Sequence, residues 1–538
     1  MRANRVIVAG LLLCALASAL GPRALASAGG DETVAIQYHF AGAADLSANT
    51  NFALAGKLLS LPSSVAFRNL VLDRLAGVYW RGLQFKADGK PVASLRPLLE
   101  DLLSVESAAS FGGTGKDHLD FVLAARLDKA RTQAWQQSLE AALGGKGEGF
   151  VAEGFPGTRW NRPGDRGLWL VQASGWLVAG QGEDLAAVRA DYLQQIHKNG
   201  RPRPALRESW LKADIDWPRL SAWVPLESSP FKLARTSVDA TSGQGRFRLT
   251  GFVTYPEAPA WQAAPWKFPR DLVREPLCSF TAARDVGPFL KADAALARLF
   301  GRSIAGQFCC WAQAQMPFQS YAAWPSPGGA GANRKLLVNS MPDLNALLTL
   351  PSQPKVIWSP KTTEIIWPRG SLITPSISAT NGPEGDYMLA KLFPLTDTAT
   401  PAPAGLWAQF EGRDDLVYYD WEFTGPRLQQ WRLLCELLPV LPPVSAAPAA
   451  PAPGSAARPP LFIVDDWLAG LPPYLNNTVT EIKRTSSNEL SLTRSTPFVL
   501  NSFELLWLSH WLTDTPAGPV NVNQLPMAKM SGPGMPSR

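Results

Sequence analysis

The chain has 538 residues, of which 46% are hydrophobic and 18% charged, and its formal net charge is +6. This composition is typical of a globular protein and excludes an intrinsically disordered one. The length allows a substantial buried core, so stability does not depend on a disulfide or a metal ion.

A secretory signal peptide is predicted over residues 1–28. Two arginines precede the apolar run Val6–Leu20, which is short for a membrane span, and cleavage is expected after Ala26 or Ala28. No later apolar run reaches the ~18 residues that a membrane helix needs. These features predict a periplasmic or secreted protein that has no transmembrane span once the signal is removed.

Removal of the signal changes the charge of the chain. The segment contains three arginines and no acidic residue, so the net charge falls from +6 to +3. A charge of this size, without a long run of Lys or Arg, gives no electrostatic reason to expect a nucleic-acid partner.

The first predicted half, residues 29–256, alternates short strands and helices. Apolar residues at every second position predict strands, and apolar residues at helical spacing predict helices. In chain order these elements are a strand at Thr33–Phe40, a helix opening at Ser63–Ser64, a strand at Leu119–Leu127, a helix at Lys129–Leu143, a hairpin at Gly167–Gly180, a helix at Asp184–His197 and a hairpin at Val238–Tyr255.

The second predicted half, residues 257–514, repeats this order in outline. Its elements are a strand at Leu277–Ala283, a helix at Gly287–Phe300, a strand at Gln307–Trp311, a strand at Leu416–Phe423, a helix at Pro426–Leu438, a hairpin at Val479–Thr493 and a helix at Ser502–Leu512. We therefore predict an α+β protein of two similar mixed helix/strand halves with antiparallel hairpins, and internal duplication is the hypothesis. The junction between the halves is the expected cleft.

Two segments fall outside this pattern. Residues 439–460 are rich in alanine and proline without a buried pattern, which predicts a linker or long loop within the second half. Residues 515–538 contain too few large apolar residues to form a core, which predicts a disordered tail.

Sequence motifs for catalysis and metal binding are weak. The four histidines are far apart and have no metal-ligand spacing, so no metal and no cofactor is predicted. Gly112–Lys116 does not fit a phosphate-binding loop, because Asp117 stands where Ser or Thr would hold magnesium. A nucleophile elbow of the Gly-x-Ser-x-Gly type is also missing from the sequence.

The cysteines raise the question of a disulfide. Cys309 and Cys310 are neighbours on a predicted strand and should therefore point to opposite faces. One of them could meet Cys278 on the preceding strand, so a Cys278 bridge to Cys309 or Cys310 is considered. The alternative is that the thiols stay free.

Acidic residues beside tryptophans are the best candidates for a ligand site. Asp420 precedes Trp421, and Asp466 precedes Trp467. Indole rings stack on the C–H faces of sugars and carboxylates bind their hydroxyls, so these four residues could form a carbohydrate site, catalytic if two acids face each other. The alternative is that Asp465 or Asp466 caps a helix and the tryptophans fill the core.

Two stretches resemble segments of large secreted proteins of Gram-negative bacteria that have no assigned function. They are Asp415–Trp421 with its following helix, and Asn477–Ser495 with Asn501–Leu512. The resemblance implies export and a duplicated α+β architecture, and it carries no catalytic residues over.

The sequence therefore favours an exported non-catalytic protein that binds a partner, a protein or an envelope component, or supports the cell envelope. The alternative is a carbohydrate-active or carbohydrate-binding secreted protein that uses Asp/Trp pairs and has a glycan as its partner.

Overall fold

The structure is a computed structural model. It describes residues 33–48, 52–82, 91–114, 119–161, 167–221, 235–259, 261, 264–286, 306–315, 319–326, 328–348, 355–367, 375–392, 400–437 and 460–513. Three of the predicted segments lie outside the described residues: the signal peptide 1–28, the helix Gly287–Phe300 and the tail 515–538. Of the predicted linker 439–460, the described part is Pro460, which begins a helix.

The described strands are numbered in chain order: β1 (Val34–Phe40), β2 (Ser107–Gly112), β3 (Asp120–Ala125), β4 (Glu148–Ala152), β5 (Phe155–Trp160), β6 (Leu168–Ala173), β7 (Trp176–Gln181), β8 (Ser209–Asp216), β9 (Arg235–Gly243), β10 (Arg246–Thr254), β11 (Leu277–Arg284), β12 (Gln307–Gln313), β13 (Ser320–Pro325), β14 (Ile357–Ser359), β15 (Glu364–Ile366), β16 (Ser376–Gly382), β17 (Gly385–Lys391), β18 (Leu416–Phe423), β19 (Asn477–Arg484) and β20 (Glu489–Thr496). The described helices are α2 (Ala43–Ala48), α3 (Ala53–Ser60), α4 (Pro62–Gly82), α5 (Pro91–Ser104), α6 (Lys129–Leu143), α7 (Ala186–Asn199), α8 (Trp217–Leu220), α11 (Ala330–Leu348), α12 (Ala404–Trp407), α13 (Thr424–Leu437), α14 (Pro460–Gly470), the 3₁₀-helix η3 (Pro472–Tyr474) and α15 (Ser502–Thr513). The predicted α+β mixture is thus confirmed.

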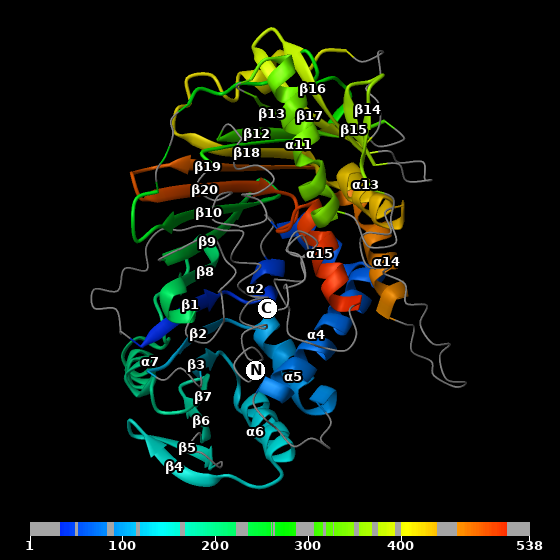
Figure 1. The fold of residues 1–538 in the computed structure, drawn as a ribbon. Coiled ribbons are helices and arrows are strands. Elements are labelled where there is room, and N and C mark those ends of the chain that lie inside the picture. The colour runs from blue at the N-terminus through cyan, green and yellow to red at the C-terminus, as the bar shows by residue number, and fades with distance from the viewer. Residues whose placement is uncertain are drawn as a thin grey trace, which may run out of the picture.

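All of the described strands join one antiparallel sheet of 20 strands, which runs through the length of the molecule in Figure 1. In the first half the neighbours run β4-β5-β6-β7-β3-β2-β1-β8-β9-β10. In the second half they run β14-β15-β16-β17-β13-β12-β11-β18-β19-β20. Strand numbers at matching places differ by ten throughout, and β10 pairs with β20 where the two orders meet.

Local sequence explains several of these elements. Asp128 caps α6 by accepting a hydrogen bond from the Arg131 backbone N–H at 2.8 Å, and Gly144 ends this helix in the left-handed region. The β9–β10 hairpin turns at Gln244 and Gly245, which have φ of +53° and +71°. Two residues with positive φ form the tight turn that matches the twist of paired strands.

Helices cover one face of the sheet in both halves, and in Figure 1 α4, α5, α6, α13, α14 and α15 lie on that side while α7 lies on the other. At the junction α4 packs against α14 and α15. The buried side chains there are apolar and come from both halves, among them Phe67 and Val78 from α4, Val464 from α14 and Leu505 from α15. In this layer, apolar side chains pack between the halves, where the sequence predicted a cleft.

Candidate functional site

A row of polar side chains crosses the helix-covered face of the second half. Cys310, Thr281, Asp420, Thr480 and Arg494 lie directly opposite one another on the successive strands β12, β11, β18, β19 and β20. Residues paired across antiparallel strands share a face, so the row forms one continuous strip below α13 and α15.

The matching row on the same face of the first half is apolar. There the residues opposite one another on β2, β1, β8 and β9 are Ala109, Tyr38, Ala213 and Val238. All four belong to or pack against hydrophobic clusters of the first half. The polar strip is therefore a property of the second half alone within the described residues.

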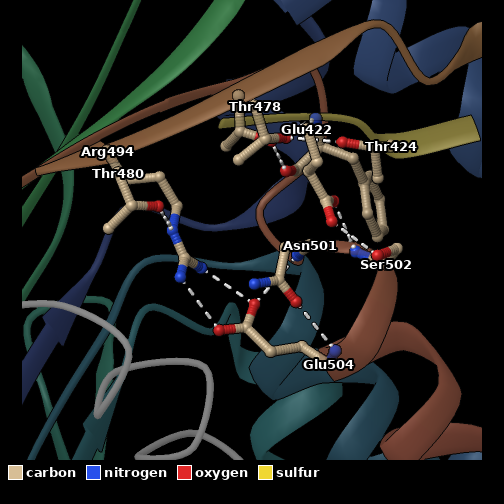
Figure 2. Close-up of polar contacts among 10 residues, drawn as sticks. Glu422, Thr424, Thr478, Thr480, Arg494, Asn501, Ser502 and Glu504 are labelled. Atoms are coloured by element: carbon tan, nitrogen blue, oxygen red, sulfur yellow. Dashed lines mark hydrogen bonds and ion pairs between the residues drawn. The ribbon is translucent and has the colours of Figure 1, made fainter. Parts of the chain in front are cut away.

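Glu422 holds the start of α15 against the sheet. Its two carboxylate oxygens accept hydrogen bonds from the Ser502 backbone N–H at 2.8 Å and from the Ser502 hydroxyl at 2.6 Å (Figure 2). The first N–H groups of a helix have no partner inside the helix, and the helix dipole favours a negative charge there. Glu422 thus provides the hydrogen-bond acceptor that the buried first N–H group of α15 needs.

A second contact at the same helix end uses Asn501 and Glu504. The Glu504 N–H donates to the Asn501 side-chain oxygen at 2.8 Å, and the Asn501 N–H donates to the Glu504 carboxylate at 2.9 Å. This reciprocal arrangement is a capping box, with Asn at the cap and Glu three residues later. It leaves the Glu504 carboxylate pointing at the sheet, where it meets Arg494 (Figure 2).

Arg494 forms a two-pronged ion pair with Glu504, with N–O distances of 2.8 and 3.0 Å. Its third donor, Nε, reaches the Thr480 hydroxyl at 3.0 Å. The Arg494 side chain is 6% exposed. Paired and hydrogen-bonded in this way, the guanidinium has the contacts that a buried charge requires.

Asp420 accepts fewer hydrogen bonds than Glu422, its neighbour on the same face of β18. It is 7% exposed, and the Thr281 hydroxyl donates a hydrogen bond to it at 2.6 Å. Burial, and then the negative charge of Glu422, raise the pKa of Asp420 to about 7. Burial also raises the pKa of Glu422, although its hydrogen bonds from Ser502 oppose this shift.

Arg427 of α13 lies on the helix side of the strip, near Cys310 and Asp420. Its Nη1 donates to the Gln430 side-chain oxygen at 2.8 Å and to the Ser320 hydroxyl at 3.3 Å. The guanidinium lies over the Trp431 ring, 4.3 Å from its centroid. Burial lowers the pKa of Arg427, and the charges of Glu422 and Asp420 act in the opposite direction.

Cys278, Cys309 and Cys310 are free thiols in the structure, so the considered disulfide is not formed. Register explains why: Cys310 lies opposite Thr281 and Cys309 opposite Ala282, both several residues along β11 from Cys278. Burial raises the pKa of Cys278 to about 11 and that of Cys310 to about 12. Protonated thiols are poor nucleophiles and poor metal ligands.

The predicted acid–tryptophan pairs are separated by the fold. Asp420 faces the helices, whereas Trp421 is on the opposite face of β18, with its ring centroid 5.0 Å from that of Phe423. Asp466 is exposed and lies within α14 rather than at its cap. Trp467 is 3% exposed and stacks on Phe67. Neither pair presents an acid and an indole together on the surface.

Sequence reasoning selected Asp420 and missed its partners Glu422, Arg427, Arg494 and Glu504. The alternation of Asp420 and Glu422 on a predicted strand was a usable signal, because it places two acids on one face.

Within the described part of the chain, no group of three His, Cys, Asp or Glu residues is arranged to bind a metal ion. None of the described helices is long and apolar enough to cross a bilayer.

Comparison with known proteins does not assign the chain to a family. The chain matches no protein-family model, and no curated protein or solved structure is significantly similar to it.

Proposed function

We propose that the chain is an exported, non-catalytic protein, periplasmic or secreted, that binds a partner or supports the cell envelope. The observation that carries this proposal is the use of these acids for internal contacts: Glu422 binds the start of α15, and Glu504 binds Arg494. A catalytic acid must instead reach a substrate.

The architecture is consistent with a structural role in the cell envelope or with partner binding. We propose that the chain is an internal duplication, because the strand neighbours of the two halves match place for place and equivalent strands, β10 and β20, pair at the centre. An antiparallel pairing of equivalent strands relates the halves by an approximate twofold axis. A continuous sheet of this length with helices packed along one face is suited to a scaffold.

The ends of the sheet are the places where a partner strand could add. Among the described residues, β4 and β14 each pair on one side, with β5 and β15 respectively. Each strand presents an exposed apolar side chain, Val151 at 71% and Ile357 at 49% exposure. Unpaired strand edges with apolar side chains favour pairing with another chain.

Site-specific photo-crosslinking in cells tests this function. A photo-reactive phenylalanine analogue at Val151 or at Ile357 should give a discrete crosslinked product, identified by mass spectrometry. The same analogue at Arg248, which is exposed at the centre of the sheet, is the control. Products of equal yield from all three positions would contradict a specific partner at the sheet ends.

Export is tested separately by sequencing the amino terminus of the protein from a periplasmic or secreted fraction. The proposal expects a mature chain beginning at Ser27 or Gly29. A full-length chain confined to the cytoplasmic fraction would overturn it.

The carbohydrate hypothesis requires an acid and an indole on one exposed surface. Asp420 and Trp421 lie on opposite faces of β18, and Trp467 is buried. A glycan array with the mature protein provides the test. Binding that is lost in the variant Trp421→Ala would favour a carbohydrate-binding function over the one proposed here.

A further inference from the structure

Three carboxyl groups and two guanidinium groups share the space between the second-half sheet and its helices. The carboxyls are Asp420 and Glu422 on β18 and Glu504 on α15, and the guanidiniums are Arg494 on β20 and Arg427 on α13. The other titratable groups that face Asp420 or Arg427 here are Tyr418 on β18, Cys278 on β11 and Cys310 on β12. These three groups are neutral at pH 7, because burial raises their pKa values.

The set is electrically balanced when one carboxyl keeps its proton. An unbalanced buried charge is costly, since it loses its hydration without gaining a counter-charge. Glu504 is paired with Arg494, and Glu422 accepts two hydrogen bonds from Ser502 at the positive end of α15. Among the described residues, Asp420 accepts a hydrogen bond from the Thr281 hydroxyl alone. Asp420 is therefore the carboxyl that keeps the proton.

We propose that Asp420 is a pH-responsive latch, which in its protonated form holds α13 and α15 on the sheet and in its ionised form loosens them. The proposal goes beyond the proposed function and does not depend on which partner the protein binds. Among the described residues of the first half there is no equivalent, because Ala213 and Val238 occupy the middle of the same face there. Its helix cover should therefore be insensitive to pH over the same range.

The direction of the response follows from where the proton binds more tightly. Asp420 has a pKa of about 7 when covered, and exposure to water on opening would return it toward the ordinary value of about 3.9. The opening equilibrium then rises by about tenfold per pH unit between these two values and levels off above pH 7. Acid tightens the cover, and neutral pH loosens it.

Hydrogen–deuterium exchange of the mature protein at pH 5, 6, 7 and 8 tests the latch. After correction for the intrinsic exchange rate, protection of peptides from Ser502–Thr513 should fall by about tenfold per pH unit from pH 5 to pH 7. Peptides from Lys129–Leu143 in the first half serve as the internal control and should keep constant protection. Equal behaviour of the two sets of peptides would overturn the proposal.

Asp420→Asn isolates the charge, because its side-chain oxygen still accepts the Thr281 hydrogen bond and it cannot ionise. Protection of α15 should then stay at the pH 5 level throughout. The matched control is Asp191→Asn on the exposed side of α7, which should behave as the wild type. A pH response retained in Asp420→Asn would contradict the latch.

If Asp420→Asn does not fold, the variant Thr281→Val tests the same proposal. The Thr281 hydrogen bond lowers the pKa of Asp420, so its loss should raise the pH at which the loss of α15 protection levels off. If that pH does not change, another group titrates.

Discussion

Leu249 of β10 lies directly opposite Arg494 of β20, at the line where the two halves of the sheet join. On the Leu249 side the matching row of the helix-covered face is apolar, and Leu249 itself is fully buried in a hydrophobic cluster. On the Arg494 side the cover is attached through charged and hydroxyl groups. The helices of the two halves are thus held to one sheet by different kinds of contact.

The ion pair of Arg494 predicts a large effect for Glu504→Gln. Gln can still complete the capping box with Asn501, so the substitution removes mainly the charge and leaves a buried guanidinium without its carboxylate. We expect a loss of about 3–5 kcal/mol in the free energy of unfolding, measured by urea denaturation. The control is Glu100→Gln, which breaks the exposed Arg96–Glu100 pair and should cost less than about 0.5 kcal/mol. Similar costs for both variants would show that the Arg494 pair is not desolvated.

The packing of Trp467 at the junction between the halves should contribute strongly to the stability of the protein. Its ring is buried against Phe67 and its N–H donates to the Ser64 hydroxyl at 3.2 Å. Trp467→Ala should lower the free energy of unfolding by about 3–5 kcal/mol, because it leaves a cavity in the helix layer. Phe503→Ala, at an aromatic that is 39% exposed, is the control and should cost less than half as much. A mild effect of Trp467→Ala would argue against a tightly packed junction.

Two glycines with similar backbone angles should respond differently to substitution. Gly182 and Gly175 have φ of +79° and +80°, so Ala is strained at either position by about 1 kcal/mol. At Gly182 an added Cβ would also collide with the Asp120 carboxylate, whereas at Gly175 it would meet open space. Asp120 accepts the Asp184 N–H at 3.0 Å. Gly182→Ala should therefore cost about 1–3 kcal/mol more than Gly175→Ala in thermal unfolding, and equal costs would contradict the contact.

The buried cysteines predict low thiol reactivity in the native protein. Burial raises the pKa of Cys278 to about 11 and that of Cys310 to about 12, so little thiolate exists at pH 8. Iodoacetamide at pH 8 should leave the peptides that contain Cys278, Cys309 and Cys310 unmodified, as read by mass spectrometry. The same peptides should be fully alkylated in urea. A disulfide in the exported protein would instead protect a pair of them in urea until a reductant is added.

Sequence periodicity by itself determined many of the local elements. The alternation in Thr33–Phe40 and Val479–Thr493 and the helical spacing in Lys129–Leu143 each predicted an element that the structure contains as β1, β19–β20 and α6. These signals are reliable because they arise within one element: the pleat of a strand and the turn of a helix fix which side chains share a face.

The tertiary structure alone decided how these elements meet. Neighbours in sequence such as Asp420 and Trp421 were separated by the pleat and placed in different layers, while Arg494 and Glu504 were joined by the packing of α15 onto β20. The cysteines were kept apart by strand register, which depends on pairing between distant segments. Burial, and with it the proton affinity of Asp420, depends on helices that come from elsewhere in the chain. Periodicity in one segment contains no information about which segment will cover it.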